Sequence, residues 1–218
     1  MGLGHSPRIV SDGLVFFLDA ANPRCYAGTG LTCYDLRASL AGFLVNGVGF
    51  GTANNGHFIF DGTNDQMQIS QVGSALLSGS QNFTISAWVQ SSGGTGTIFG
   101  NYPAGNLQVF YSPSYIGMWL NDNSAYAVAA THYSANIVNL VAQRSSGTNL
   151  TIYLNGQVIR TGSSNATIGT TLDFRIGATT ANAELFQGKI YNLQVHNRAL
   201  SSTEILQNYA AVKGRYGL

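Results

Sequence analysis

A histidine, two serines and a glutamate lie close together near the end of the chain, in the segment VHNRALSSTEI. His196, Ser201 or Ser202, and Glu204 are the residue types of a hydrolase triad, in which a base activates a nucleophile and an acid orients the base. Ser201 and Glu204 also have the Ser-x-x-Glu spacing of a helix capping box. We favour the capping box, because proximity in sequence is poor evidence for the geometry of a triad.

Paired carboxylates for glycoside hydrolysis are the other enzymatic chemistry to consider. Such a pair needs two acidic side chains about 5–10 Å apart across a cleft. The chain has nine acidic residues, of which only Glu184 and Glu204 are glutamates. No E-x-D-x-x-E strand motif of the kind that glycanases use is present. The sequence therefore predicts a protein that is not an enzyme, with no catalytic residues.

Two aspartates flank a polar turn, DGTND. Calcium takes about six to eight oxygen ligands, mostly carboxylates and carbonyls. Asp61 and Asp65 would supply carboxylates, Asn64 an amide oxygen, and Asp19 could approach from a neighbouring strand. Asp and Asn also cap turns through their own backbone, so turn capping is the alternative interpretation. Calcium is the one cofactor that this pattern suggests, with Asp61 and Asp65 as the ligands to test.

Aromatic residues gather in the segment NYPAGNLQVFYSPSYIGMWLND. A glycan site would combine exposed aromatic rings with amide and carboxylate partners. Tyr102 and Tyr115 stand beside prolines and serines in expected loops, so we predict them as glycan-binding residues. Tyr111 and Trp119 are further candidates. For Trp119 and Trp88, burial in a core is the stronger interpretation, because alternate strand positions face inward.

The elements that must position these residues read as strands. Short runs rich in β-branched and aromatic residues alternate with Gly, Asn, Ser and Asp, a pattern typical of a sandwich or barrel. Asn155-Gly156, between two such runs, is the preferred pair for a two-residue hairpin. The expected strands are residues 13–20, 57–62, 65–70, 82–90, 96–101, 106–112, 115–121, 136–145, 150–156, 172–178 and 189–197.

Only the end of the chain breaks this pattern. In SSTEILQNYAAVKG, four apolar residues recur at helical spacing, namely Ile205, Leu206, Tyr209 and Val212. Gly214 follows at a position where helices commonly end. The sequence predicts an amphipathic helix of about three turns over residues 201–213 that packs against the sandwich.

Composition excludes several partners. Charged residues make up only 9% of the chain and the net charge is +1, so the basic stripe needed for nucleic-acid binding is absent. No apolar run is long enough to span a membrane, and the first residues lack the apolar core of a signal peptide. Cys25 and Cys33 would form a disulfide in an oxidising compartment; two unpaired cysteines on a loop or on adjacent strands are the alternative.

A series of segments carries a resemblance to a known family. GLVFFLDAANPRCYAGTG, FDGTNDQMQI, NFTISAWVQ, IYLNGQ, FRIGA and FQGKIYNLQVHNRALSSTEILQNY occur in that order. Over roughly residues 12–215 the chain resembles the concanavalin A-like, laminin-G-like jelly-roll superfamily, in its pentraxin-like branch. The ending, in which F-x-G-x-I leads into NRALS-x-x-EI, is the most specific part.

The resemblance implies an all-β, two-sheet antiparallel jelly-roll sandwich of about a dozen strands with a short C-terminal α-helix. Such domains generally bind glycans or proteins, and many bind calcium. Members of the family often have a serine-like residue at the position of Cys25 and a tryptophan at that of Cys33, so cysteine at both favours a disulfide. We expect an N-terminal extension at residues 1–11 and a single domain at residues 12–218.

Standalone copies of this domain resemble virion components of tailed phages. We therefore predict a non-enzymatic structural protein on the virion surface, such as a capsid decoration, head-fibre or tail-associated protein. Its expected partners are other capsid or tail proteins, with a homo-oligomer on the assembled particle, after synthesis in the host cytoplasm without a signal peptide. A carbohydrate-binding module for host or surface attachment, with cell-surface glycans as partners, is the alternative.

Overall fold

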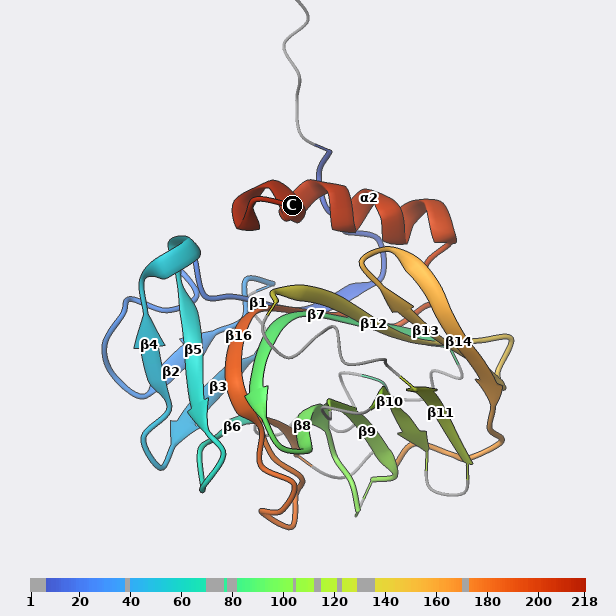
Figure 1. The fold of residues 1–218 in the computed structure, drawn as a ribbon, viewed down its shortest axis with the longest axis horizontal. Helices are drawn as coiled ribbons and strands as arrows, with labels where there is room; N and C mark the ends of the chain where they lie inside the picture. Colours follow the sequence, from blue (N-terminus) through green and yellow to red (C-terminus); the bar gives the residue numbers. More distant parts are fainter. Residues whose placement is uncertain are drawn as a thin grey trace, which may run out of the picture.

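Two antiparallel sheets packed face to face form the body of the protein, and helix α2 (Ser202–Lys213) lies across one of them (Figure 1). The computed structural model describes residues 7–37, 40–69, 77, 82–103, 105–111, 115–120, 123–128, 136–169 and 173–218. This architecture confirms the predicted jelly-roll sandwich with a C-terminal helix. In the described part, no helix combines the length and the apolar composition of a membrane span.

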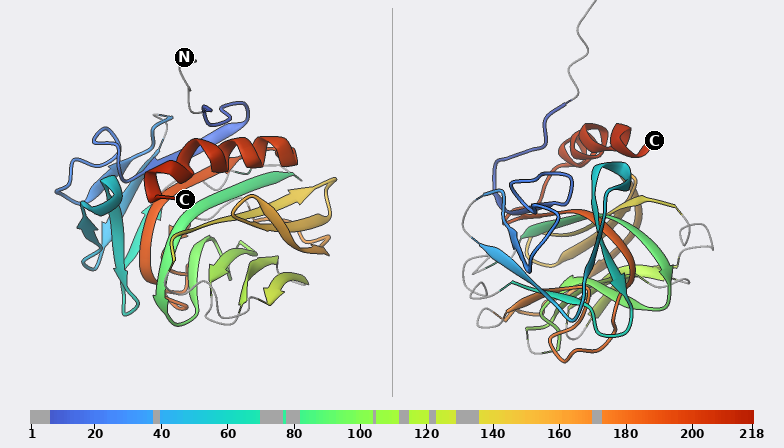
Figure 2. Two further views of the ribbon diagram at one scale, coloured as in Figure 1. Left: turned by 45° about the horizontal axis from the view of Figure 1, so that its top comes forward. Right: turned by 90° about the vertical axis from the view of Figure 1, so that its left-hand side faces the viewer.

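The first sheet is the one that α2 covers, as both views of Figure 2 also show. Its longest strands, β7 and β16, run side by side at its centre. In spatial order its strands are β14 (Gln157–Ser163), β13 (Asn149–Leu154), β12 (Val138–Ser145), β7 (Phe83–Gly93), β16 (Gln187–His196), β5 (His57–Asp61) and β4 (Gly49–Gly51), and β1 (Leu14–Asp19) also pairs with β16.

The second sheet lies on the side away from α2 (Figure 1). Strands distant in sequence are neighbours in it, because β15 joins β8 on one side and β6 on the other. Its strands, in spatial order, are β11 (Asn123–Val128), β10 (Tyr115–Leu120), β9 (Leu107–Tyr111), β8 (Gly96–Gly100), β15 (Phe174–Ile176), β6 (Gln66–Ile69), β3 (Ala41–Val45) and β2 (Thr32–Tyr34).

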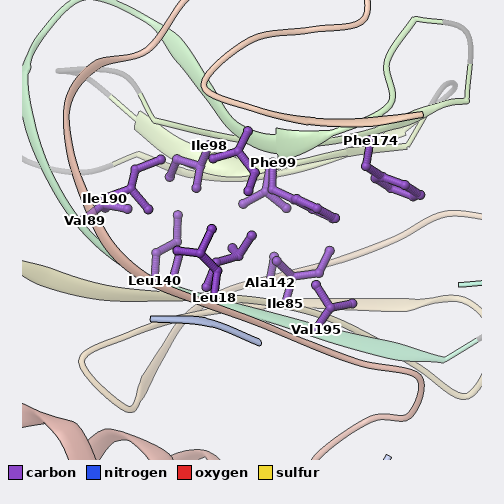
Figure 3. Packing of buried hydrophobic residues seen from close by; sticks show 14 of the residues in the cluster. Leu18, Ile85, Val89, Ile98, Phe99, Leu140, Ala142, Phe174, Ile190 and Val195 are labelled. Carbon is purple, nitrogen blue, oxygen red and sulfur yellow. The ribbon is translucent and has the colours of Figure 1, made fainter. Parts of the chain in front are cut away.

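The core fills the space between the two sheets. Successive side chains of a strand point to opposite faces, so alternate apolar residues of each strand meet there. Figure 3 shows Ile98, Phe99 and Phe174 of the second sheet facing Leu140 and Val195 of the first. The rings of Phe99 and Phe174 stack with their centroids 4.9 Å apart. Burying such side chains contributes roughly 1.5–3 kcal/mol each.

A second apolar layer lies between the first sheet and α2. Trp88 and Tyr191 point out of β7 and β16 and pack with Val212 of the helix. Trp88 is therefore buried, but beneath the helix rather than in the sandwich core. Leu206, expected on the packing side of the helix, is 43% exposed, whereas its neighbour Ile205 is 1% exposed. The helix thus turns Ile205 and Val212 inward.

The segment before β1 also contacts the helix. Val10 N donates to the Asn208 side chain at 2.7 Å, and the carbonyl of Arg8 accepts from Gln207 at 2.7 Å. Ile9 and Val10 are partly buried against the apolar layer under α2. Residues near position 10, which the sequence places in an N-terminal extension, therefore pack against the domain.

Each expected strand has a counterpart, and the expected hairpin is confirmed. Asn155 and Gly156 have φ of 49° and 80° and join β13 to β14, as a two-residue turn with positive φ at both positions requires. Strands β2, β3, β4, β11 and β14 were not among the expected ones. β2 and β4 are three residues long, and β14 is exposed or half-buried along its whole length, so alternation of apolar residues gives no signal there.

Candidate functional site

His196, Ser201 and Glu204 are structural residues at the junction of β16 and α2. The Ser201 side chain accepts from Glu204 N, and a Glu204 carboxylate oxygen accepts from Ser201 N at 2.7 Å, which confirms the capping box. Arg198 donates to both carboxylate oxygens of Glu204, at 2.6 and 3.0 Å. Hydrogen bonds from Arg198 and from the Ser201 backbone lower the pKa of Glu204 to about 2.

His196 is fully buried at the end of β16. Its Nε2 lies 3.0 Å from the Val10 carbonyl oxygen, and its Nδ1 has no hydrogen-bond partner in the described part. Since a carbonyl only accepts, Nε2 carries the proton and donates it to Val10. Burial, the largest influence, lowers the pKa of His196, so the ring is held neutral.

Asp61 and Asp65 organise the turn between β5 and β6. One Asp61 oxygen accepts from Thr63 N at 2.7 Å and from Asn64 N at 3.4 Å, and an Asp65 oxygen accepts from Asp61 N at 3.0 Å. Hydrogen bonds from the turn lower the pKa of Asp61, whereas burial raises that of Asp65. Asp19 instead binds Arg215 at 2.7 Å.

These contacts fit turn capping better than a preformed calcium site. Calcium needs about six to eight oxygens, and an oxygen of each aspartate already accepts backbone N–H groups. In the described ranges, no three His, Cys, Asp or Glu side chains gather as a ligand set. Calcium binding at Asp61 and Asp65 stays a prediction.

Tyr102 is held in a closely defined loop between β8 and β9. The buried Asn101 side chain accepts from Leu107 N and donates to the Gly169 carbonyl, both at 3.1 Å. The carbonyl of Tyr102 itself accepts from both the backbone N and the hydroxyl of Thr180, each at 2.8 Å. The loop that follows β15, through Thr180, therefore fixes the backbone of Tyr102.

The Tyr102 ring packs edge-on against Trp119 of β10, with ring centroids 6.2 Å apart. Both side chains are half-buried. Trp119 Nε1 is itself buried and has no partner in the described part. Of the other predicted glycan contacts, Tyr111 is buried in the core. Tyr115 begins β10, and its side chain lies outside the described part.

Trp119 also begins a line of paired residues across the second sheet. Residues directly opposite one another on neighbouring strands point to the same face. The core takes the alternate residues, such as Met118, Val109 and Ile176, so this line faces outward, away from the first sheet. We call it the outer-face row, and in order across the sheet it consists of Trp119, Gln108, Gly100, Arg175, Gln68 and Phe43.

Polar side chains in and beside the row form two hydrogen-bonded groups, one around Gln108 and one around Gln66. Gln108 donates to Thr97 at 2.8 Å and to the carboxylate of the exposed Glu184. Gln66, on the same face of β6, accepts from Arg175 at 2.6 Å and donates to Asn182 at 2.9 Å. Because both glutamines are buried, these bonds fix the orientation of their amides.

This face carries charged groups of both signs, the Arg175 guanidinium and the carboxylates of Asp173 and Glu184. Burial, the larger influence, lowers the pKa of Arg175, and the nearby Asp173 carboxylate opposes that shift. Arg175 Nε is buried without a partner in the described part. Glu184, which accepts from Gln108, supplies a carboxylate near the Trp119 end of the row. The face thus offers the half-buried Gln68 and Arg175 and the exposed Glu184 carboxylate beside an aromatic pair, whereas Gln108 and Gln66 lie buried.

A sandwich of two antiparallel sheets with one outer face covered by a helix places the chain in a class of jelly-roll domains. The model of the concanavalin A-like lectin/glucanases superfamily matches residues 61–206. The chain belongs to this superfamily. A comparison with curated protein sequences found no match.

Several solved structures share the fold. The receptor binding domain of botulinum neurotoxin type G superposes with a TM-score of 0.68 and 16% identity, over 91% of this chain and 51% of that one. The binding domain of Paraclostridial mosquitocidal protein 1 gives 0.69 and 14%, over 90% and 52%. This chain therefore spans about half the length of these toxin domains.

A third similar structure is comparable in length to this chain. Domain 4 of AbnA, an extracellular arabinanase of Geobacillus stearothermophilus solved in complex with arabinotriose, superposes with a TM-score of 0.66 and 14% identity. The match covers 90% of this chain and 98% of that domain. At these identities the likeness shows the fold.

Proposed function

We propose that the protein is a non-enzymatic carbohydrate-binding module whose ligand lies on the outer face of the second sheet, over the Trp119 end of the outer-face row. The observation that carries the proposal is the pairing of Tyr102 with Trp119 beside the exposed Glu184 carboxylate, which the buried Gln108 amide holds in place. An aromatic ring offers an apolar face to a sugar ring, and amides and carboxylates bind sugar hydroxyls.

The rigidity of this face supports the proposal. Gln108 is held by Thr97 and Glu184, and the Tyr102 backbone is held by Thr180. Groups fixed before binding lose little conformational entropy when a ligand arrives. On the other sheet, α2 covers the outer side of the central strands β7 and β16. Similar folds whose names describe receptor binding or an arabinotriose complex add support.

A glycan array followed by calorimetry tests the proposal. The wild-type protein is expected to bind at least one oligosaccharide, and Tyr102→Ala and Trp119→Phe are expected to weaken that binding at least tenfold. Leu206→Ala, an exposed apolar residue on the opposite side of the molecule, is the matched control and should bind as wild type does. A blank array, or binding insensitive to both aromatic substitutions, would refute the site.

The virion-surface role stays a prediction alongside this proposal. A decoration, head-fibre or tail-associated protein can also bind glycans, so the two functions are compatible. Mass spectrometry of purified particles tests the first role, and absence of the protein from particles would exclude it. Size-exclusion chromatography tests the expected homo-oligomer.

A further inference from the structure

Cys25 and Cys33 form a buried pair of thiols at the edge of the second sheet. Their Sγ atoms are 2.9 Å apart, and the two side chains are 0% and 2% exposed. Tyr34 N, next to Cys33 on β2, donates to the Cys25 carbonyl at 2.7 Å. Backbone hydrogen bonding therefore holds the two segments together independently of the sulfurs.

The residue after Cys25 anchors the same loop to the core. The Tyr26 ring lies 5.1 Å from that of Phe50 and 5.2 Å from that of Phe58, between centroids. Its hydroxyl donates to the Gly30 carbonyl at 2.8 Å. These contacts fix the loop between the two cysteines from inside, so that the thiols face each other in the folded chain.

A pocket of about 330 Å³ opens on the solvent side of this loop. Its walls include Cys25 itself, the guanidinium-bearing Arg24, and the side chains of Leu31 and Tyr34. Leu31 is 71% exposed and Tyr34 is 59% exposed. The shape of this pocket depends on the position of a loop with few buried side chains of its own.

We propose that Cys25 and Cys33 are a modification site, joined as a disulfide when the chain meets a disulfide oxidant, and that this bond ties the wall of the pocket to β2. In the reaction, the thiolate of one cysteine attacks a sulfur of the oxidant, and the first oxidant thiol leaves. The other cysteine then attacks the mixed disulfide and releases the second oxidant thiol. Two cysteine thiols are oxidised, and one oxidant disulfide is reduced to two thiols.

We expect the disulfide to form while the chain folds, before the two thiols become buried. Both thiols are buried once the loop has closed, and hydrogen bonding to Cys25 and burial raise the pKa of the Cys33 thiol, so that little of its thiolate, the reactive form, is present. We expect rapid oxidation during refolding and slow oxidation of folded, reduced protein. Once formed, the bond is sheltered from reductants because both cysteines are buried.

Refolding the reduced chain with oxidised glutathione tests the bond. Alkylation in denaturant without reductant is expected to label neither cysteine, and alkylation after reduction should label both. The intact mass should fall by two hydrogens with no change in oligomeric state. Two labelled cysteines without reductant, a glutathione adduct, or a disulfide-linked dimer would each overturn the proposal.

Thermal unfolding and amide hydrogen exchange test what the bond does. Reduction of the oxidised protein is expected to lower Tm by roughly 5–10 °C, from the entropy of a short loop in a chain of this size. The Cys25→Ala/Cys33→Ala variant is the control, and its Tm should not respond to reductant. Exchange at residues 26–32 should be slower in the oxidised protein; equal exchange in both forms would refute the role at the pocket.

Discussion

The indole of Trp88 on β7 lies parallel to the ring of Tyr209 on α2, with centroids 5.5 Å apart and planes 8° apart. Tyr216, in the short helix after α2 (η2, Gly214–Tyr216), packs on the same indole at 4.7 Å. Two aromatic residues of the closing segment thus share one tryptophan of the central strand. The helix is docked through a specific contact as well as through apolar burial.

Ile205→Ala tests how strongly the helix is docked. Ile205 is buried against Val141, Tyr153 and Leu200, and truncation of such a residue costs about 2–5 kcal/mol. Leu206→Ala is the matched control on the exposed side and should change the free energy of unfolding by less than about 0.5 kcal/mol. Urea denaturation measures both, and equal losses would mean that α2 packs through another face.

Ser201→Ala should lower the free energy of unfolding by about 1 kcal/mol, because the backbone N–H of Glu204 loses its acceptor. Ser202→Ala, at the next and exposed position, should have almost no effect. Because the pKa of Glu204 is lowered on folding from 4.5 to about 2, its contribution is present above pH 4.5 and disappears as pH falls toward 2. Glu204→Gln keeps an acceptor for the cap but loses the paired bonds from Arg198, so it should lose both this acid dependence and the stability that the carboxylate adds above pH 4.5.

Acidification below neutral should destabilise the protein through its buried histidines. Burial lowers the pKa of both His196 and His57 in the folded chain, so the unfolded chain binds their protons more tightly. The stability they confer is present above about pH 6.5 and is lost as pH falls below it. For His196 the cost is direct, because a proton on its buried Nδ1 would have no acceptor among the described residues.

His196→Gln should flatten the pH dependence of the free energy of unfolding between pH 7.5 and 5.5. The slope that it removes is at most about 1.4 kcal/mol per pH unit. His57→Gln serves as the comparison. It should remove only the part of this pH dependence that comes from His57. Denaturation curves that run parallel to wild type for His196→Gln would show that this ring does not titrate on unfolding.

Calcium provides a test of the turn between β5 and β6. If Asp61 and Asp65 bind the ion, saturating calcium should raise Tm, EDTA should reverse the rise, and Asp61→Asn should abolish it. An ion at about a hundred times its Kd would stabilise the folded state by about 2.7 kcal/mol. Asp12→Asn is the control, because Asp12 pairs with Arg198 beyond the opposite end of β16. No change in Tm with calcium would leave Asp61 and Asp65 as capping residues.

Local patterns were enough to predict the strands of a sandwich or barrel and the closing helix, whereas the two-sheet jelly roll was predicted from the resemblance to a known family. Alternation marks β7 clearly, since Ile85, Ala87 and Val89 all enter the core. The capping box and the Asn155-Gly156 turn are also local, because each depends on residues within a few positions. The three-residue strand β4 and the strand β14, which is exposed or half-buried throughout, carry no such alternation. Sequence reasoning missed both of them, together with β2, β3 and β11.

The outer-face row could not be predicted in the same way. Gln108 and Arg175 are far apart in the sequence, and they come together only because β15 pairs beside β8. Glutamine at alternate strand positions signals an outward face, yet nothing local says which strands are neighbours. Tyr102 was predicted as a loop residue, but its pairing with Trp119 depends on how β10 lies beside β9. Strand order, which is set by long-range pairing, was the missing information.

Both described ends of the chain approach the molecule from the same side. Arg8 contacts Gln207 of α2, and Leu218 N donates to the Lys213 carbonyl at 3.3 Å. The outer face of the second sheet lies on the opposite side (Figure 1). A sensor surface or fusion partner joined at either end would thus be attached on the α2 side of the molecule. The side that carries the outer-face row would remain directed toward the solution.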